Sequence, residues 1–119
     1  MQNPKKLLVT ARARELAVLT YRATQALPRD ERFGLTSQMR RAAVSIGSNI
    51  AEGCGRQSDT AFAAFLHYAL GSANELEFQL GISLDLAFLP VAECEILASR
   101  IIEMKKMLSR LIVSVSRKG

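Results

Sequence analysis

Hydrophobic residues in the first part of the chain recur mostly every three or four positions, which is the spacing of one face of an α-helix. Asn3 followed by Pro4 is typical of a helix start, because Asn caps the first turn and Pro suits its first position. A helix is therefore predicted from Asn3-Pro4 to about Ala26. Its predicted inner face consists of Leu8, Ala11, Leu16, Leu19, Ala23 and Ala26. The charged stretch "LPRDERFG" (27–34) contains Pro and Gly and predicts a loop.

The same spacing predicts a second helix from near Thr36-Ser37 to the glycines Gly53 and Gly55, which favour a helix C-terminus. Its predicted inner face consists of Leu35, Met39, Ala42, Ala43, Ile46 and Ile50.

Ser58 followed by Asp59 predicts the start of a third helix, since a Ser cap and an early negative charge both suit a helix N-terminus. Its predicted inner face consists of Phe62, Phe65, Leu66, Ala69, Ala73, Leu76, Leu80 and Leu84. The segment "AFLP" predicts a turn, and Pro90 opens a fourth helix. Its predicted inner face consists of Leu97, Ile101, Met104, Leu108, Leu111 and Val115.

Four helices with short connections predict an all-α fold, an antiparallel up-down-up-down four-helix bundle that forms one domain over residues 1–119. Helix breaks are expected near residues 27–35, 54–58 and 87–90. No apolar run approaches the roughly 20 residues that span a bilayer, so no membrane association is expected and the cytoplasm is the predicted location. Cys54 and Cys94 are then expected to be free thiols.

The second helix has an unusual set of polar residues beside its apolar face. They are Gln38, Arg41, Ser45, Asn49 and Glu52, at steps of three and four residues. Polar groups at the border of a core need partners once they are buried. Arg41, Asn49 and Glu52 are therefore expected to be buried and hydrogen-bonded, within the bundle or across a subunit contact. Glu75 of the third helix is included in this network, because Glu75 or Glu77 can meet Arg40 or Arg41; a ligand site is the alternative.

Charge is segregated along the chain. Residues 1–56 contain ten basic and four acidic side chains, residues 57–99 contain six acids and no Lys or Arg, and residues 100–119 contain six bases and one acid. A basic excess near both ends can attract a polyanion, although a solvated mixed surface is the simpler interpretation. The candidate nucleic-acid-binding residues are Arg12, Arg14, Arg22, Arg40, Arg41, Lys105, Lys106 and Arg110.

Catalytic or metal-binding groups are not recognisable in the sequence. His67 is the single histidine, and it has no metal-ligand spacing to either cysteine. Glu75 and Glu77 are two residues apart on a helix and so point in different directions. The glycines near Cys54 do not match a phosphate-binding loop. We expect no enzyme activity, no metal and no cofactor.

The segment "LTSQMRRAAVSIGSNIAEGCGR" (35–56), together with "GSANELEFQL" (71–80) and "RLI" near the C-terminus, closely resembles a bacterial four-helix-bundle family, the 23S rRNA-intervening sequence proteins. The resemblance covers nearly the whole chain. The family usually has Pro where Gly47 stands, a departure that affects the bend of the second helix.

The resemblance implies an up-down bundle that assembles as a ring, commonly a homopentamer. A related protein, the accessory variability determinant of diversity-generating retroelements, is a basic ring that associates with a reverse transcriptase and nucleic acid. Founding members are encoded inside intervening sequences of large ribosomal RNA genes, and most members have no established biochemical function. No catalytic residues are implied.

Two functions remain open at the level of sequence. One is a non-enzymatic homo-oligomeric scaffold that binds RNA, or a nucleic-acid-handling partner, through basic surface. The other is a protein–protein interaction module without nucleic-acid binding. In either case one subunit's acidic third helix is expected against a neighbour's first or fourth helix. The apolar residues expected on outward positions are Val18, Leu70, Phe78 and Ile112.

Overall fold

The computed structural model describes residues 3–118, which form four α-helices and one short 3-10 turn. The elements are α1 (Pro4–Thr24), η1 (Arg29–Glu31), α2 (Leu35–Cys54), α3 (Asp59–Asp85) and α4 (Val91–Lys118). Residues 3–118 include no strand, so the predicted all-α fold is confirmed. The predicted breaks between helices are also confirmed, to within two residues.

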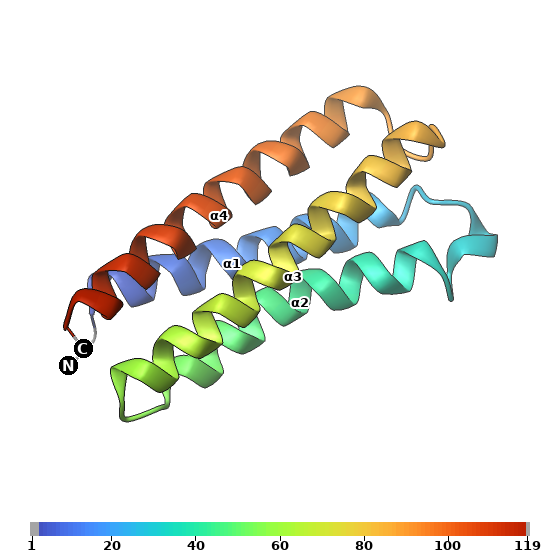
Figure 1. Cartoon of the computed structure of the whole chain (residues 1–119). Coiled ribbons are helices and arrows are strands. Elements are labelled where there is room, and N and C mark those ends of the chain that lie inside the picture. The colour runs from blue at the N-terminus through green and yellow to red at the C-terminus, as the bar shows by residue number, and fades with distance from the viewer. Residues whose placement is uncertain (1–2, 119) are drawn as a thin grey trace.

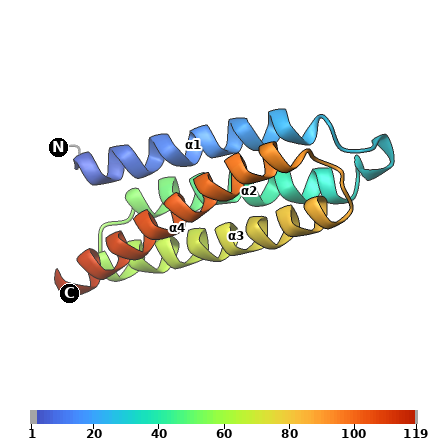
Figure 2. The ribbon, with the colours of Figure 1, turned by 90° about the horizontal axis from the view of Figure 1, so that it is seen from above.

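Consecutive helices run antiparallel and lie side by side, so the two chain ends meet at the same end of the bundle (Figures 1 and 2). Contacts are most extensive between α2 and α3 and least extensive between α1 and α4, which close the circle of helices. The bundle therefore has one tight contact and one loose contact on opposite sides.

Side chains cap the helices largely as the sequence predicts. The Asn3 carboxamide oxygen accepts a hydrogen bond from the Lys5 N–H at 2.8 Å, and the Ser58 hydroxyl accepts one from the Ala61 N–H at 3.1 Å. α2 begins at Leu35 because the Glu31 carboxylate accepts the Leu35 N–H at 3.0 Å. A side chain from η1 thus caps the helix that follows it.

The predicted inner faces of α2 and α4 form the core. Met39, Ile46 and Ile50 of α2 have no exposed surface, and neither do Ile101 and Leu108 of α4. On α3 the prediction is wrong at Leu84, which is 43% exposed. Buried Ser83 takes its place and directs its hydroxyl toward the Met39 sulfur at 3.3 Å. The outward position predicted for Ile112 is also wrong, because this side chain is buried.

The predicted inner face of α1 is partly wrong. Leu8, Ala11 and Ala26 are exposed, whereas α1 buries Val9, Ala13, Leu16, Thr20 and Thr24. Threonine is tolerated in this core because each buried hydroxyl has a local acceptor. Thr20 donates to the Leu16 carbonyl at 2.8 Å and Thr24 to the Thr20 carbonyl at 2.7 Å. The helix ends at Thr24, which lets Leu27 fold back into the core.

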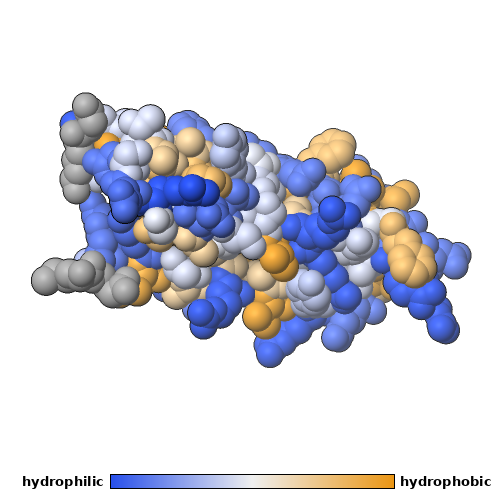
Figure 3. Space-filling model, turned by 90° about the horizontal axis from the view of Figure 1, so that it is seen from below, coloured by the Kyte–Doolittle hydropathy of each residue, from blue (hydrophilic) through white to orange (hydrophobic). Residues whose placement is uncertain are grey.

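The remaining surface is mixed in character. On the face seen from below, hydrophobic side chains are scattered among hydrophilic ones (Figure 3). Over residues 3–118, no helix is both long and apolar enough to cross a membrane. Both cysteines are free thiols, as predicted, with Cys54 exposed and Cys94 buried. Burial raises the pKa of the Cys94 thiol, and the neighbouring carboxylates Glu93 and Glu95 raise it further.

Candidate nucleic-acid interface

The loose contact between α1 and α4 leaves two hollows on the surface. The larger has a volume of about 710 Å³ and is lined by Leu8 and Arg12 of α1 and by one side of α4. Its α4 lining includes apolar Ala98, Ile102 and Met107 as well as charged residues. The smaller hollow, of about 360 Å³, is lined by Arg14, Glu15, Val18, Leu19, Arg22 and Arg100. We call the surface around both hollows the α1–α4 face.

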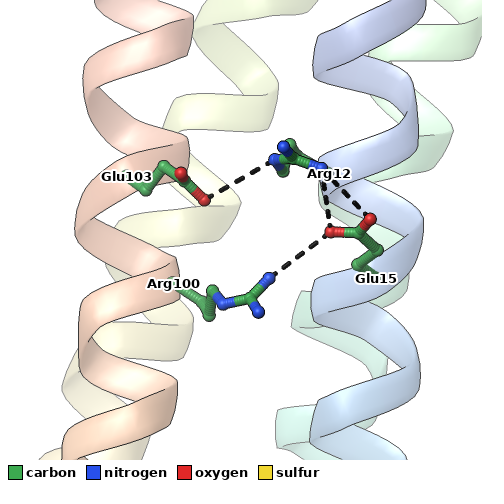
Figure 4. Close-up of polar contacts among 4 residues, drawn as sticks. All are labelled: Arg12, Glu15, Arg100 and Glu103. Atoms are coloured by element: carbon green, nitrogen blue, oxygen red, sulfur yellow. Dashed lines mark hydrogen bonds and ion pairs between the residues drawn. The ribbon is translucent and has the colours of Figure 1, made fainter.

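Four charged residues form ion pairs between the two helices, and we call them the ion-pair ladder (Figure 4). Arg12 contacts Glu15 on its own helix at 3.1 Å and Glu103 across the gap at 3.9 Å. Arg100 contacts Glu15 at 3.4 Å. All four side chains are between about a third and a half exposed, so water screens these pairs and each contributes about 0–1 kcal/mol.

The structure brings five of the eight predicted basic residues to the α1–α4 face. They are Arg12, Arg14, Arg22, Lys106 and Arg110. Apart from Arg12, each of these is exposed and has no ion pair with any residue of the described range 3–118. Four cationic groups therefore remain available to an external anion along one side of the bundle.

Arg40 makes contacts within the bundle, and its role as a nucleic-acid contact stays a prediction. Its guanidinium donates to the Thr24 hydroxyl at 2.9 Å and to the Tyr21 carbonyl at 3.2 Å. It also lies 4.7 Å from the centre of the Tyr21 ring. These contacts use the planar face and two donors of the guanidinium, so Arg40 joins α2 to α1; it does not line either hollow of the α1–α4 face.

Lys105 lines a hollow of about 430 Å³ together with Lys106 and Arg110, but it differs from them in being paired with α3. Its ammonium group contacts the Glu77 carboxylate of α3 at 2.8 Å, and both side chains are partly exposed. The predicted pairing of Glu75 or Glu77 with Arg40 or Arg41 is wrong within the described range 3–118, where Glu77 pairs with Lys105, Arg40 contacts α1, and Arg41 has no ion pair with Glu75. The sequence alone does not show which base pairs with which acid, because the packing of the core sets how neighbouring helices are aligned.

The predicted polar network of α2 forms only in part. Asn49 donates to the Ser45 carbonyl at 2.9 Å, and the Ser45 and Ser72 hydroxyls are 2.9 Å apart across the α2–α3 contact. Burial of Arg41 and Glu52 within the bundle was predicted and is wrong, because both are exposed; Glu52 pairs locally with Arg56 at 3.0 Å. Burial across a subunit contact stays a prediction.

Two other members of that network, Gln38 and Glu75, are exposed and line an open hollow with Arg41. We call this hollow, between α2 and α3, the polar hollow. It lies on the opposite side of the bundle from the α1–α4 face, since the helices follow one another around the circle. Arg41 is thereby separated from the five candidates on the α1–α4 face.

Sequence analysis missed Arg100 as part of the α1–α4 face. Arg100 has no motif of its own, and its partner Glu15 is 85 residues away in sequence. Only the packing of α1 against α4 makes them neighbours. Within residues 3–118, no group of three or more His, Cys, Asp or Glu side chains is placed to hold a metal ion, and His67 is exposed on α3.

Comparisons with known proteins agree with this architecture. No curated protein matches the chain. Among solved structures, a protein of unknown function from the S23 ribosomal protein family of Bacteroides thetaiotaomicron superimposes with a TM-score of 0.84. It is 28% identical, and the match covers 91% of this chain and 97% of that one. The family model for 23S rRNA-intervening sequence proteins matches residues 5–110. The chain therefore belongs to the 23S rRNA-intervening sequence protein family.

Proposed function

We propose that this protein is a non-enzymatic, homo-oligomeric scaffold that binds RNA through the α1–α4 face. The observation that favours it most is the set of four exposed cationic side chains without ion pairs: Arg14, Arg22, Lys106 and Arg110. Arrayed Lys and Arg side chains are sufficient for phosphate contacts, which need no base-reading motif. The looseness of the α1–α4 contact leaves these side chains on an open surface.

The proposal that identical subunits form a ring rests on two features of the surface, which are exposed apolar side chains and complementary charged patches. Phe78 and Val18 are 72% and 42% exposed, and a protein–protein contact would remove such large apolar groups from water. The charge segregation provides complementary patches, because α3 has no basic residue while α1 has an excess of them. When one patch of each subunit binds a different patch of its neighbour, and the same rotation relates every pair of neighbours, the subunits can close into a ring.

Filter binding of a structured RNA at low and moderate salt tests the RNA proposal. We expect affinity to fall steeply with salt, because bound phosphates release counterions. The triple variant Arg14→Glu, Lys106→Glu and Arg110→Glu should bind at least tenfold more weakly. Its log–log salt slope should be lower by about 2–3, which corresponds to three lost phosphate contacts.

The matched control is the triple variant Arg29→Glu, Arg32→Glu and Arg56→Glu. It makes the same change in net charge but lies outside the α1–α4 face, in η1 and the two loops beside α2. The control should bind RNA within a few-fold of the unmodified protein. Equal losses in both variants would show that only net charge matters, and the α1–α4 interface would be rejected.

A protein–protein interaction module is the second candidate function. The ion pair between Lys105 and Glu77 favours this function, because the pair neutralises one of the cations that RNA would need. RNA binding that is undetectable at low salt would support this module over the RNA scaffold. Light scattering tests oligomerisation separately, and a mass near 13.1 kDa over a wide concentration range would exclude the ring.

A further inference from the structure

An open groove lies between α3 and α4 at the end of the bundle where α3 turns into α4 (Figure 1), and the proposed function does not use it. It has a volume of about 250 Å³. Both helices contribute to its apolar lining, which consists of Leu80, Gly81, Leu84, Val91, Cys94 and Ala98. We call this feature the α3–α4 groove.

Exposed apolar side chains are concentrated around the groove. Leu84 and Val91, which line it, are both exposed, and Phe78, three residues before Gly81 on α3, is 72% exposed. Gly81 itself has open space beside it, because a β-carbon added there would have no atom within 4 Å. Apolar groups that gather on an exposed surface in this way mark a contact with a partner.

The charged residues around the groove are acidic. Residues 77–98 contain no Lys, Arg or His and four acids, which are Glu77, Asp85, Glu93 and Glu95. Glu77 is paired with Lys105, whereas the other three acids are exposed and have no ion pair within the described range 3–118. Three carboxylates therefore remain available to a cationic partner.

The groove itself lies in a negative field. Burial raises the pKa of the Cys94 thiol in the groove lining, and the carboxylates of Glu93 and Glu95 raise it further. A partner with basic side chains is attracted to such a surface, whereas RNA or an anionic membrane is repelled by it.

The size and setting of the groove favour a helical partner. Its volume is below the roughly 300–1,000 Å³ of sites that enclose small ligands, so it suits single side chains of a larger partner. Residues 3–118 contain no strand whose edge could pair with an extended peptide. An amphipathic helix, by contrast, fits an apolar groove with side chains spaced three and four residues apart.

We propose that the α3–α4 groove docks a basic amphipathic helix of another protein. The apolar side of this helix packs on Leu84, Val91 and Phe78, and its Lys and Arg side chains pair with the acids beside the groove. Glu95 and Ala98 also line the larger hollow of the α1–α4 face. The decisive variant is therefore made at Gly81, which lines the groove and neither hollow of that face.

Fluorescence anisotropy with a labelled synthetic peptide tests the proposal on the unmodified full chain. The probe is a helix of about 18 Leu and Lys residues whose leucines form one apolar stripe. The control peptide has the same composition, with its leucines distributed around the helix. We expect the striped peptide to bind at least about tenfold more tightly than the control peptide, and to bind more weakly as salt increases.

Gly81→Arg places a long cationic side chain at the groove, and Gly71→Arg is its matched control. Gly71 lies on the same helix, is equally open to an added β-carbon and does not line the groove. Arg has a higher helix propensity than Gly, so neither variant should melt at a lower temperature. Gly81→Arg should weaken binding of the striped peptide at least about tenfold, and Gly71→Arg by less than about threefold. RNA binding should be equal in the two variants, which separates this test from that of the proposed function.

Four results would overturn the proposal. Equal losses in both variants would show that net charge alone governs binding. Equal binding of the striped and control peptides would show that no groove is recognised. A Leu and Glu peptide with the same stripe that binds as tightly would show that the acids play no part. A lower oligomeric mass for Gly81→Arg than for Gly71→Arg would assign the groove to a second copy of the chain.

Discussion

The contacts on opposite sides of this bundle are built from different side chains. Between α2 and α3 the facing residues are small, including buried Ala42, Ala69 and Ala73, and the two serine hydroxyls of Ser45 and Ser72 meet across the gap. Between α1 and α4 the ion-pair ladder crosses the gap between the helices (Figure 4). The larger hollow beside it is lined by charged residues and by a few apolar ones.

The difference shows how one fold separates stability from binding. Small residues let two helices approach closely and exclude water, so a change of even one methyl group at such a contact affects the packing. Long charged residues keep two helices apart and remain hydrated, so they contribute little to stability but stay accessible to a partner. We therefore expect substitutions at the α2–α3 contact to change stability strongly, and those at the α1–α4 face to change binding.

The largest effect is expected at Gly53. A β-carbon added there would lie 2.8 Å from the β-carbon of Phe65 and 3.0 Å from a ring carbon of Phe62. Because a β-carbon cannot swing away, Gly53→Ala forces α2 and α3 apart and should lower the free energy of unfolding by about 1–3 kcal/mol. Denaturant unfolding measures this.

Gly71→Ala is the matched control for Gly53→Ala. No atom lies within 4 Å of a β-carbon added at Gly71, which is also helical. Here the helix propensity of Ala should raise stability by up to about 1 kcal/mol. Similar changes in both variants would mean that helix propensity, not close packing, decides the effect.

A smaller loss is expected for Arg40→Ala, which removes two hydrogen bonds and the contact with the Tyr21 ring. We expect a loss of about 0.5–1.5 kcal/mol in thermal or chemical unfolding, the usual net contribution of hydrogen bonds, because these contacts are partly exposed. Arg29→Ala, which removes an exposed arginine of η1, should change stability by less than about 0.5 kcal/mol. A negligible effect of Arg40→Ala would show that its contacts with Tyr21 and Thr24 do not hold α2 against α1.

The smallest effect is expected within the ion-pair ladder. Glu15→Gln removes the negative charge that Arg12 and Arg100 share, and both arginines are partly exposed. The loss of stability should not exceed about 1 kcal/mol and should vanish in 1 M salt, where exposed pairs are screened. A larger loss that persists in high salt would show that the α1–α4 contact stabilises the fold as strongly as the α2–α3 contact.

The fold was predictable where hydrophobic spacing is strong. The observed inner faces of α2 and α4 agree with the predicted ones, because their large apolar residues are regularly spaced and, apart from the partly buried Leu35, are all buried in the core. α1 was mispredicted because Thr20 and Thr24 bury hydroxyls that bond to their own helix, which a count of apolar residues overlooks. The turn after α3 places Ala87 at a φ of 57°, a conformation that its residue type does not indicate.

The sequence predicted which basic residues could form the candidate interface, but not where these residues lie relative to one another. Charge counts identified the basic residues, but the packing of the helices places these residues in different surroundings. Arg40 contacts α1, Lys105 contacts α3, and Arg41 lines the polar hollow. These outcomes depend on which helices are neighbours and in what register, and a single chain sequence does not encode that information in any local pattern.

Photo-crosslinking of a thiouridine-containing RNA to the unmodified protein, followed by peptide mapping, tests the central claim most directly. The account predicts crosslinks to α1 and α4 peptides around Arg14, Arg22, Lys106 and Arg110, and fewer crosslinks as salt increases. Crosslinks concentrated on α2 and α3, or equal crosslinking on every helix, would contradict a binding function for the α1–α4 face.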